Sequence, residues 1–327
     1  MAYDNAVKAL DIVIACSAIL GNGLVIFVMT VRRKQFTSVT NRLILHQSVV
    51  DFVSGVTFLG LRVIKGPGSF VGAEVGDTFW GVLVCRLIES DYFIWGLNVT
   101  SSYNLVVISL ERFLATCYPV KHRNYCSLFK IKVSMCAAWI IGFAYSTRVI
   151  AMRRVHQGMC VPVRFSAVYL ILPPLLVEYM IPVTLMAFSY VKIYLMLRRK
   201  LAGETNANQR GQGVLSKAKR NVLKTMLIAG TLFFVCWSPI MVVRFLIITT
   251  NIEYLEVVFI ACYGLVMCNM SVNPVVYCFK YEHFQVQLMH LIRSTFRRNR
   301  VQAGGETNPT PLSIDPIQPT RATQLTM

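Results

Sequence analysis

ALDIVIACSAILGNGLVIFVMTV, residues 9–31, is the stretch that decides the fold. It contains one acidic residue, Asp11, and no basic residue. A helix crosses the hydrocarbon core of a bilayer with about 20 apolar residues, whereas the apolar core of a signal peptide has about 7–15. The stretch is too long for a signal peptide, and no small-residue cleavage site follows it. We therefore expect a retained membrane-spanning helix.

Six more apolar stretches of comparable length follow the first. They cover residues 41–64, 83–117, 131–152, 166–197, 218–249 and 254–279. Asp51 interrupts the second stretch, and Glu89 and Asp91 interrupt the third. Segments rich in Gly, Pro and charge separate the stretches, and these segments, 152–158 among them, are expected to be loops. The sequence thus predicts an all-α membrane protein with a seven-helix bundle over residues 9–279.

The composition and the distribution of charge agree with a membrane protein. The 327 residues are 55% hydrophobic and 15% charged, with a net charge of +18. A nucleic-acid surface would explain that charge, but so would basic loops on the cytoplasmic side. With the N-terminus outside, 24 of the 33 Lys and Arg fall on the inner side and 9 on the outer side. We therefore expect an extracellular segment 1–8, a multi-pass plasma-membrane protein and no nucleic-acid partner.

The chain after the seventh stretch divides into two parts. Residues 280–298 carry an apolar stripe at helical spacing, with Lys and Arg beside it. The stripe consists of Phe284, Leu288, Leu291, Ile292 and Phe296. This pattern predicts an amphipathic helix on the membrane surface. Residues 299–327, rich in Pro, Thr, Gln and Gly, are expected to form a disordered cytoplasmic tail.

Polar residues inside the apolar stretches need an explanation, because a charge at the centre of a bilayer costs about 2.5–3.5 kcal/mol on insertion scales. The group comprises Asn22, Asp51, Asn98, Ser101, Asn104, Arg112, Asn269 and Asn273. A single asparagine would simply join two helices. An aspartate and several amides on four helices favour one functional network instead.

Prolines and aromatic residues form a second set. Pro182, Pro239 and Pro274 each lie deep in an apolar stretch, where a missing backbone hydrogen bond permits either a static kink or a hinge. Phe233 and Trp237 share one helix face near Pro239. Aromatic residues at this spacing usually belong to the core, so the set alone decides nothing.

Taken in order along the chain, these motifs resemble those of the rhodopsin-like (class A) G-protein-coupled receptors. The motifs are Gly21-Asn22, Leu45 with Asp51, Glu111-Arg112-Phe113, Trp139, Pro182 with Tyr190, Cys236-Trp237-Ser238-Pro239 and Asn273-Pro274-Val275-Val276-Tyr277. The resemblance covers roughly residues 15–296. Within the family, the chain looks most like neuropeptide and orphan receptors.

The resemblance assigns roles to particular residues. It implies that a heterotrimeric G protein is contacted or controlled by Glu111, Arg112, Tyr190 and Tyr277. It implies an activation switch made of Pro182, Phe233, Trp237, Pro239, Asn273 and Pro274. It implies a sodium ion held in the inactive state by Asp51, Ser101, Asn269 and Asn273, with no other cofactor. It also implies a disulfide between Cys85 and Cys160.

Four features depart from the family pattern, one of them Ser102, which stands where an isoleucine is usual. Cys85 and Arg112 are 27 positions apart, two more than is usual, so the start of the third helix is out of register. Lys219 stands where family members often carry a glutamate that pairs with the arginine. Because that ion pair cannot form here, we expect a higher basal activity. Met267 occupies the place of the retinal lysine, which excludes an opsin.

The ligand is expected to enter the bundle from outside, because residues 1–8 are too short for a binding domain. The expected lining is Asp91, Tyr92, Trp95, Glu178, Trp237, Arg244 and Tyr263. Mixed charges and aromatic rings favour a peptide. An amine or another small molecule is the alternative. The aspartate of amine receptors falls at Ile94 when counted from Arg112, but at Tyr92 when counted from Cys85.

Other classes of protein fit less well. A seven-span channel or transporter would carry internal repeats with paired broken helices, and the hydropathy pattern has neither. An enzyme is not expected, because the chain contains no Ser-His-Asp, metal-ligand or phosphate-loop constellation. A seven-helix membrane protein that does not signal is the last alternative.

Overall fold

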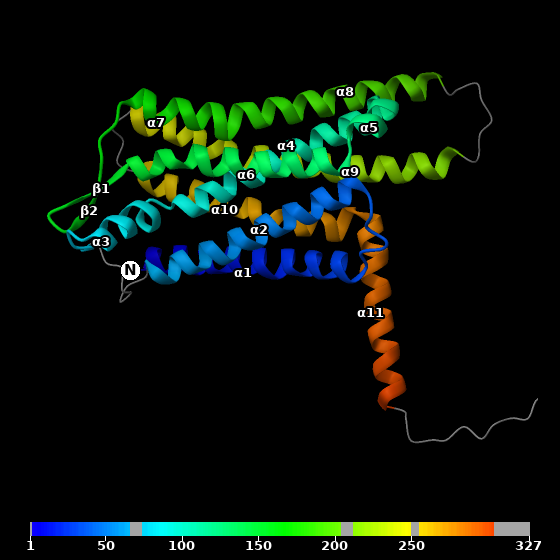
Figure 1. Cartoon of the computed structure of the whole chain (residues 1–327), viewed down its shortest axis with the longest axis horizontal. Helices are drawn as coiled ribbons and strands as arrows, with labels where there is room; N and C mark the ends of the chain where they lie inside the picture. Colours follow the sequence, from blue (N-terminus) through cyan, green and yellow to red (C-terminus); the bar gives the residue numbers. More distant parts are fainter. Residues whose placement is uncertain (1, 66–73, 204–211, 250–254, 304–327) are drawn as a thin grey trace, which may run out of the picture. The chain divides into compact units, whose positions relative to one another are not determined.

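A computed structural model describes residues 2–65, 74–203, 212–249 and 255–303 (Figure 1). The elements are α1 (Ala2–Val31), α2 (Val39–Ile64), α3 (Phe79–Val84), the π-helix η1 (Cys85–Glu89), α4 (Tyr92–Cys117), α5 (Pro119–Tyr125), α6 (Leu128–Ala151), β1 (Arg153–His156), β2 (Met159–Pro162), α7 (Ala167–Pro173), the π-helix η2 (Pro174–Met180), α8 (Ile181–Gly203), α9 (Gln212–Thr249), α10 (Leu255–Lys280) and α11 (Glu282–Ala303). Within these ranges, seven helical spans are long and apolar enough to cross a membrane. The predicted seven-helix fold is confirmed.

The chain divides into two units, residues 1–287 and 288–327. The first contains the helix bundle. The second contains the C-terminal part of α11, which reaches Ala303, five residues beyond the expected end of the amphipathic helix. The remainder of the expected tail, 304–327, lies outside the described residues. The predictions of a helix on the membrane surface and of a disordered tail stay predictions.

Serine residues mark the starts of three helices. Ser38 accepts a hydrogen bond from a backbone N–H in the first turn of α2, Ser127 does so for α6 and Ser166 for α7. The first N–H groups of a helix have no partner within it, so a serine at this position stabilises the helix start.

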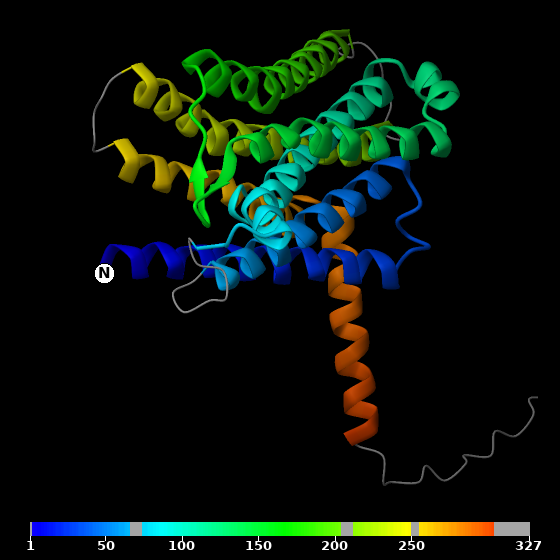
Figure 2. The same ribbon diagram turned by 60° about the vertical axis from the view of Figure 1, so that its left-hand side comes forward.

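The fourth helix, α4, is central to the bundle (Figures 1 and 2). It contacts α2, α6, α8 and α9. Large apolar side chains elsewhere face outward: Leu20 is 73% exposed, Ile140 68% and Phe27 59%. Hydrocarbon around the bundle accommodates such side chains, whereas water would not.

The third span is not one continuous helix. It begins as α3, widens into the π-turn η1 at Cys85 and breaks at Asp91, which has a left-handed backbone with φ of 59°. A π-turn holds one residue more than an α-turn, and aspartate tolerates the left-handed region better than most residues. Both irregularities lie between Cys85 and Arg112, where the chain has two residues more than is usual in the family. From Tyr92 onward α4 is regular.

A β-hairpin and the short helix α5 were not anticipated from the sequence. Residues 152–158, expected as a loop, contain β1, which pairs antiparallel with β2 in the register Val155 to Cys160. Gln157 and Gly158 at the turn both have positive φ angles, as tight hairpins require. The hairpin lies at the end of the bundle where α1 begins, here called the hairpin end, and α5 lies at the opposite α5 end (Figure 1).

Gly142 of α6 packs so tightly on α4 that a larger side chain at this position is expected to destabilise the bundle. A Cβ atom there would meet Gly96 O at 2.6 Å and Thr100 N at 2.9 Å. We expect Gly142→Ala to destabilise the bundle by about 1–3 kcal/mol because the helices must separate. The matched control is Gly60→Ala, whose Cβ would meet no described heavy atom within 4 Å. Thermal unfolding of the solubilised protein tests this, and equal midpoints for the two variants would contradict it.

Candidate functional site

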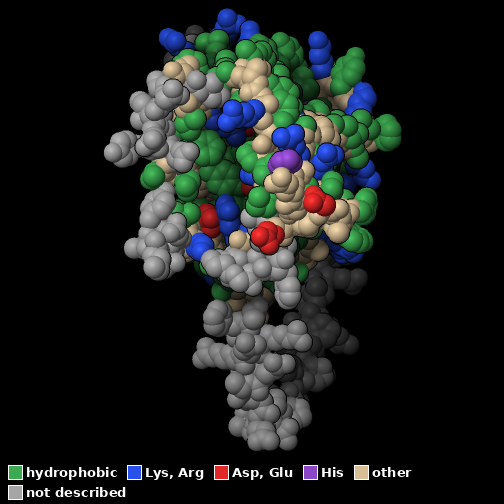
Figure 3. All heavy atoms as spheres, turned by 90° about the vertical axis from the view of Figure 1, so that its left-hand side faces the viewer, with side chains coloured by type: hydrophobic (Ala, Val, Ile, Leu, Met, Phe, Trp, Pro, Cys, Tyr) green, Lys and Arg blue, Asp and Glu red, His purple; other side chains and the backbone are tan. Residues whose placement is uncertain are grey.

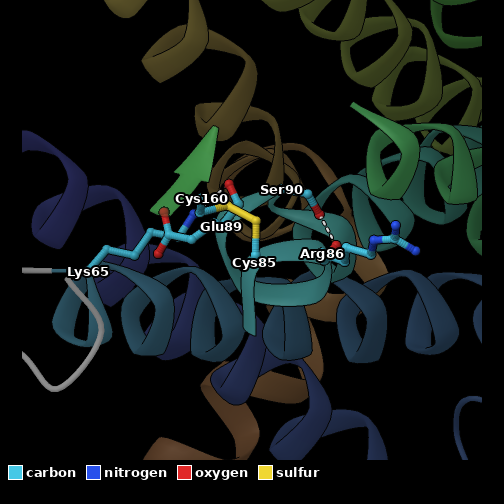
Figure 4. Close-up of a disulfide and its surroundings, with 6 residues drawn as sticks. All are labelled: Lys65, Cys85, Arg86, Glu89, Ser90 and Cys160. Carbon is cyan, nitrogen blue, oxygen red and sulfur yellow. Dashed lines mark hydrogen bonds between the residues drawn. A yellow bond between two sulfur atoms is a disulfide. The ribbon is translucent and has the colours of Figure 1, made fainter. Parts of the chain in front are cut away.

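The disulfide at the hairpin end joins Cys85 of η1 to Cys160 of β2 (Figure 4). Its two Cα atoms are 5.4 Å apart. Beside it, the Lys65 ammonium contacts the Asp91 carboxylate at 2.7 Å and donates to Glu89 O at 3.4 Å. The disulfide implied by the resemblance is therefore present, and it fixes the hairpin to the start of the third span.

Three aromatic side chains, one each from α4, α9 and α10, lie close together in the bundle. The ring centroid of Trp95 lies 6.4 Å from that of Trp237 and 6.0 Å from that of Tyr263. Trp237 is fully buried and also packs on Phe233 at 5.6 Å. Seen from the hairpin end, the surface is hollowed, with hydrophobic side chains at the floor and both basic and acidic side chains around it (Figure 3).

A buried ion cluster lies beside these rings. Glu178, 1% exposed, accepts from Arg148 Nη2 at 2.6 Å and from Arg244 Nη1 at 3.2 Å. The Tyr145 hydroxyl donates to the same carboxylate at 3.1 Å. The Arg244 guanidinium in turn covers the Trp95 ring at 5.1 Å. Glu178 lies within the π-turn η2, and turns of this kind often occur at functional sites.

The structure brings five of the seven expected ligand residues together and places two elsewhere. Asp91 pairs with Lys65 at the start of α4, while Tyr92 packs on Phe143 of α6 at 5.8 Å. Sequence reasoning missed Tyr145. Arg148 and Arg244 are the cationic partners that a carboxylate at the depth of Glu178 was expected to require.

A hydrogen-bonded cluster surrounds Asp51 in the middle of the bundle. The carboxylate accepts from Ser101 Oγ at 2.7 Å, from Asn273 Nδ2 at 2.8 Å and from Gln47 Nε2 at 3.0 and 3.2 Å. Three of the four expected sodium ligands are thus gathered. Asn269 is buried, but among the described residues its Nδ2 has no hydrogen-bond partner. Gln47 was missed, although it lies one helical turn before Asp51 on the same face.

The cluster continues toward α6. Gln47 Oε1 accepts from Asn104 Nδ2 at 2.7 Å, and Asn104 Oδ1 lies 2.9 Å from His46 Nδ1. The other ring nitrogen of His46 accepts from Trp139 Nε1 at 2.9 Å. His46 therefore connects the Trp139 indole to the Asp51 cluster.

At the α5 end, Glu111 and Arg112 form a bidentate ion pair. Arg112 Nε lies 2.6 Å from Glu111 Oε2, and its Nη2 lies 2.6 Å from Oε1. Thr40 donates to Glu111 at 3.1 Å and also accepts from Arg112. His122 Nε2 of α5 lies 2.8 Å from Glu111 Oε1. Arg112 is thus held by its neighbour Glu111.

The expected tyrosines lie in separate environments. The Tyr190 hydroxyl is 2.9 Å from Ser109 Oγ of α4. Tyr277 is fully buried, and no described residue hydrogen-bonds to its hydroxyl. Nearby, Tyr281 donates to Asn41 Oδ1 at 2.5 Å. Burial raises the pKa of Tyr281 to about 12, against a smaller opposing effect of Arg112, so the hydroxyl stays protonated and able to donate.

The expected hinge prolines all lie in membrane-spanning helices. Pro239 lies inside α9 and Pro274 inside α10, where its side chain faces Gly21 of α1 so closely that a Cβ there would be 3.0 Å away. Pro182 is the second residue of α8, directly after η2. The missing N–H of Pro182 explains why the helix widens into a π-turn at this point. The side chain of Lys219 lies outside the described residues.

The Glu178 cluster predicts that two acids of the hairpin end differ greatly in their contribution to the stability of the fold. Removing one partner of a buried ion pair typically costs about 3–5 kcal/mol, and Glu178→Gln would leave two guanidinium groups without a counter-ion. The control is Asp91→Asn, because the more exposed pair of Asp91 with Lys65 contributes only about 0–1 kcal/mol. Thermal unfolding of both variants checks this. A Glu178→Gln midpoint no lower than that of Asp91→Asn would refute it.

Comparisons with known proteins agree with this architecture. Residues 21–277 match the family model described as "7 transmembrane receptor (rhodopsin family)". The chain is 25% identical to trace amine-associated receptor 1 from Homo sapiens, with 91% of each chain covered. It is 26% identical to the RYamide receptor from Drosophila melanogaster, over 84% of this chain and 61% of the relative. It is 24% identical to trace amine-associated receptor 13c from Danio rerio, over 84% and 82%.

The family consists of signalling receptors rather than enzymes, and its members act with extracellular ligands and G proteins. The seven apolar helices and the relatives indicate a multi-pass protein of the plasma membrane. The match spans all seven helices, and the chain accordingly belongs to the rhodopsin family of seven-transmembrane, G-protein-coupled receptors.

Proposed function

We propose that this receptor binds a peptide in the hollow at the hairpin end and activates a heterotrimeric G protein at the α5 end. In this orientation the N-terminus is extracellular, which agrees with the excess of Lys and Arg in the loops of the other side. The observation that carries the proposal is the joined cluster of aromatic rings and charges around Trp95, Arg244 and Glu178.

The chemistry of the hollow supports a peptide over an amine. Because α4 is regular from Tyr92, counting back from Arg112 is the valid register, and Ile94 then stands at the place of the amine-binding aspartate. Ile94 is fully buried. The Glu178 carboxylate is already bound by two guanidinium groups, so an ammonium group would have to displace one of them. A peptide can use both the hydrophobic floor of the hollow and the charges around it.

An amine is the second candidate, and two of the relatives favour it. They are named trace amine-associated receptors and align over most of their length. A relative named RYamide receptor supports the peptide. The two candidates differ in which ligand class produces a response, so one panel of compounds separates them.

The test is a panel of amidated peptides and amines, applied to cells that express the full chain, with G-protein activation as the readout. We expect a peptide to activate the wild type. Arg112→Ala should abolish the response at equal surface expression, because Arg112 is the residue that would meet the G protein. A response to amines alone would contradict the peptide proposal and favour an amine as the ligand. A surface-expressed receptor without ligand-driven or basal activation would refute G-protein signalling.

The Glu111–Arg112 pair generates a second prediction. Charge-assisted hydrogen bonds contribute about 1.5–3 kcal/mol each, and 1.4 kcal/mol corresponds to a factor of ten in an equilibrium. We therefore expect Glu111→Gln to raise ligand-independent signalling by on the order of tenfold, because Arg112 is released.

The control is Thr40→Ser, which keeps the hydroxyl that contacts both members of the pair. It should leave basal signalling unchanged. Equal basal signalling in Glu111→Gln and in the wild type, at matched surface expression, would show that the pair does not hold the inactive state.

A further inference from the structure

The Asp51 cluster contains a feature that the resemblance does not imply. A single nitrogen, Gln47 Nε2, lies 3.2 Å from Asp51 Oδ1, 3.0 Å from Asp51 Oδ2 and 2.6 Å from Ser101 Oγ. Those three oxygens belong to residues that would ligate a sodium ion in related receptors. A hydrogen-bond donor of this chain therefore already lies among them.

The orientation of the Gln47 amide follows from the ends of its hydrogen-bonded chain. The Trp139 indole can only donate, so His46 Nε2 must accept and His46 Nδ1 must carry the proton. That proton is donated to Asn104 Oδ1, and Asn104 Nδ2 donates to Gln47 Oε1. The remaining group of Gln47, its NH₂, can only face Asp51, which as a carboxylate only accepts.

The residues around Asp51 fit a cation poorly. A hard cation requires oxygen ligands, yet Asn273 presents Nδ2 rather than its oxygen, at 2.8 Å from Asp51. Ser101 donates its own proton to Asp51 and accepts from Gln47, so its oxygen is also occupied. Gln47 and Asp51 are fully buried. A cation would have to break several mutually consistent hydrogen bonds to enter.

We propose that the Gln47 carboxamide replaces the sodium ion of related receptors as the internal partner of Asp51, which makes this receptor insensitive to sodium. The charge of Asp51 is balanced by oriented N–H and O–H dipoles from α2, α4 and α10 instead of by an ion. Because the amide is covalently part of α2, this partner is present at any salt concentration.

The experiment measures thermal unfolding of the solubilised full chain in sodium chloride and in choline chloride of equal ionic strength. We expect the wild type to unfold at the same temperature in both salts. Gln47→Ala removes the amide and leaves space beside Asp51, so sodium should raise its midpoint by roughly 2–4 °C. This rise should disappear in the double variant with Asp51→Asn. Gln47→Met, which fills the same space without a donor, should show a smaller rise than Gln47→Ala.

Two outcomes would overturn the proposal. The first is a wild-type midpoint that rises in sodium and ceases to do so in Asp51→Asn, because a cation would then bind despite Gln47. The second is a folded Gln47→Ala variant with no sodium response, because Gln47 would then not be what excludes the ion. Should that variant fail to fold, the wild type and Asp51→Asn alone decide between the alternatives. Neither result depends on a ligand or a G protein, so failure here is distinct from failure of the proposed signalling function.

Discussion

The buried carboxylate of Asp51 is the constraint on which the interior of the bundle depends. A charge at this depth is stable only when donors surround it, and those donors come from Gln47, Ser101 and Asn273 on three different helices. Each donor fixes the rotation of its helix about its own axis. The hydrogen-bonded chain that continues to Trp139 adds α6, so four of the seven spans share one arrangement. Polar contacts set the orientation of each helix, which packing between apolar helices in lipid does not set.

Other residues with strict requirements account for where the helices are irregular. Both π-turns occur at the hairpin end, and each contains a residue whose side chain must point in one direction. These residues are Cys85, which forms the disulfide, and Glu178, the buried acid. A regular helix offers a side chain a new direction every 100°, whereas a π-turn shifts the following residues to another face. Chain length and side-chain direction are therefore adjusted locally, and α4 and α8 stay regular below these turns.

Two kinds of feature could be predicted from the sequence: those that depend on apolar content summed over many residues, and those that depend on the type of a single residue. The spans follow from apolar content over about 20 residues, so neighbouring substitutions scarcely affect their positions. The residues Asp51, Ser101 and Asn273 were grouped because each is polar inside a span. Gln47 is also polar inside a span, between His46 and Ser48, but it was left out because it belongs to none of the motifs that were recognised. The partners of Glu178 come from α6 and α9, and the pairing of β1 with β2 depends on contacts between segments. Spacing along one helix carries no signal for either.

Within the described part of the chain, the buried indole of Trp237 is held by packing alone. Its N–H has no hydrogen-bond partner among the described residues, so packing against Phe233 and Trp95 holds the ring in place. Trp95 is held in turn by Arg244, and Arg244 by Glu178. A ring held only by packing takes a new position when its neighbours move. A hydrogen-bonded ring would first have to break its hydrogen bond, which contributes about 0.5–1.5 kcal/mol. The ion cluster at the hairpin end is therefore connected to Trp237 by packing through one intervening ring, that of Trp95.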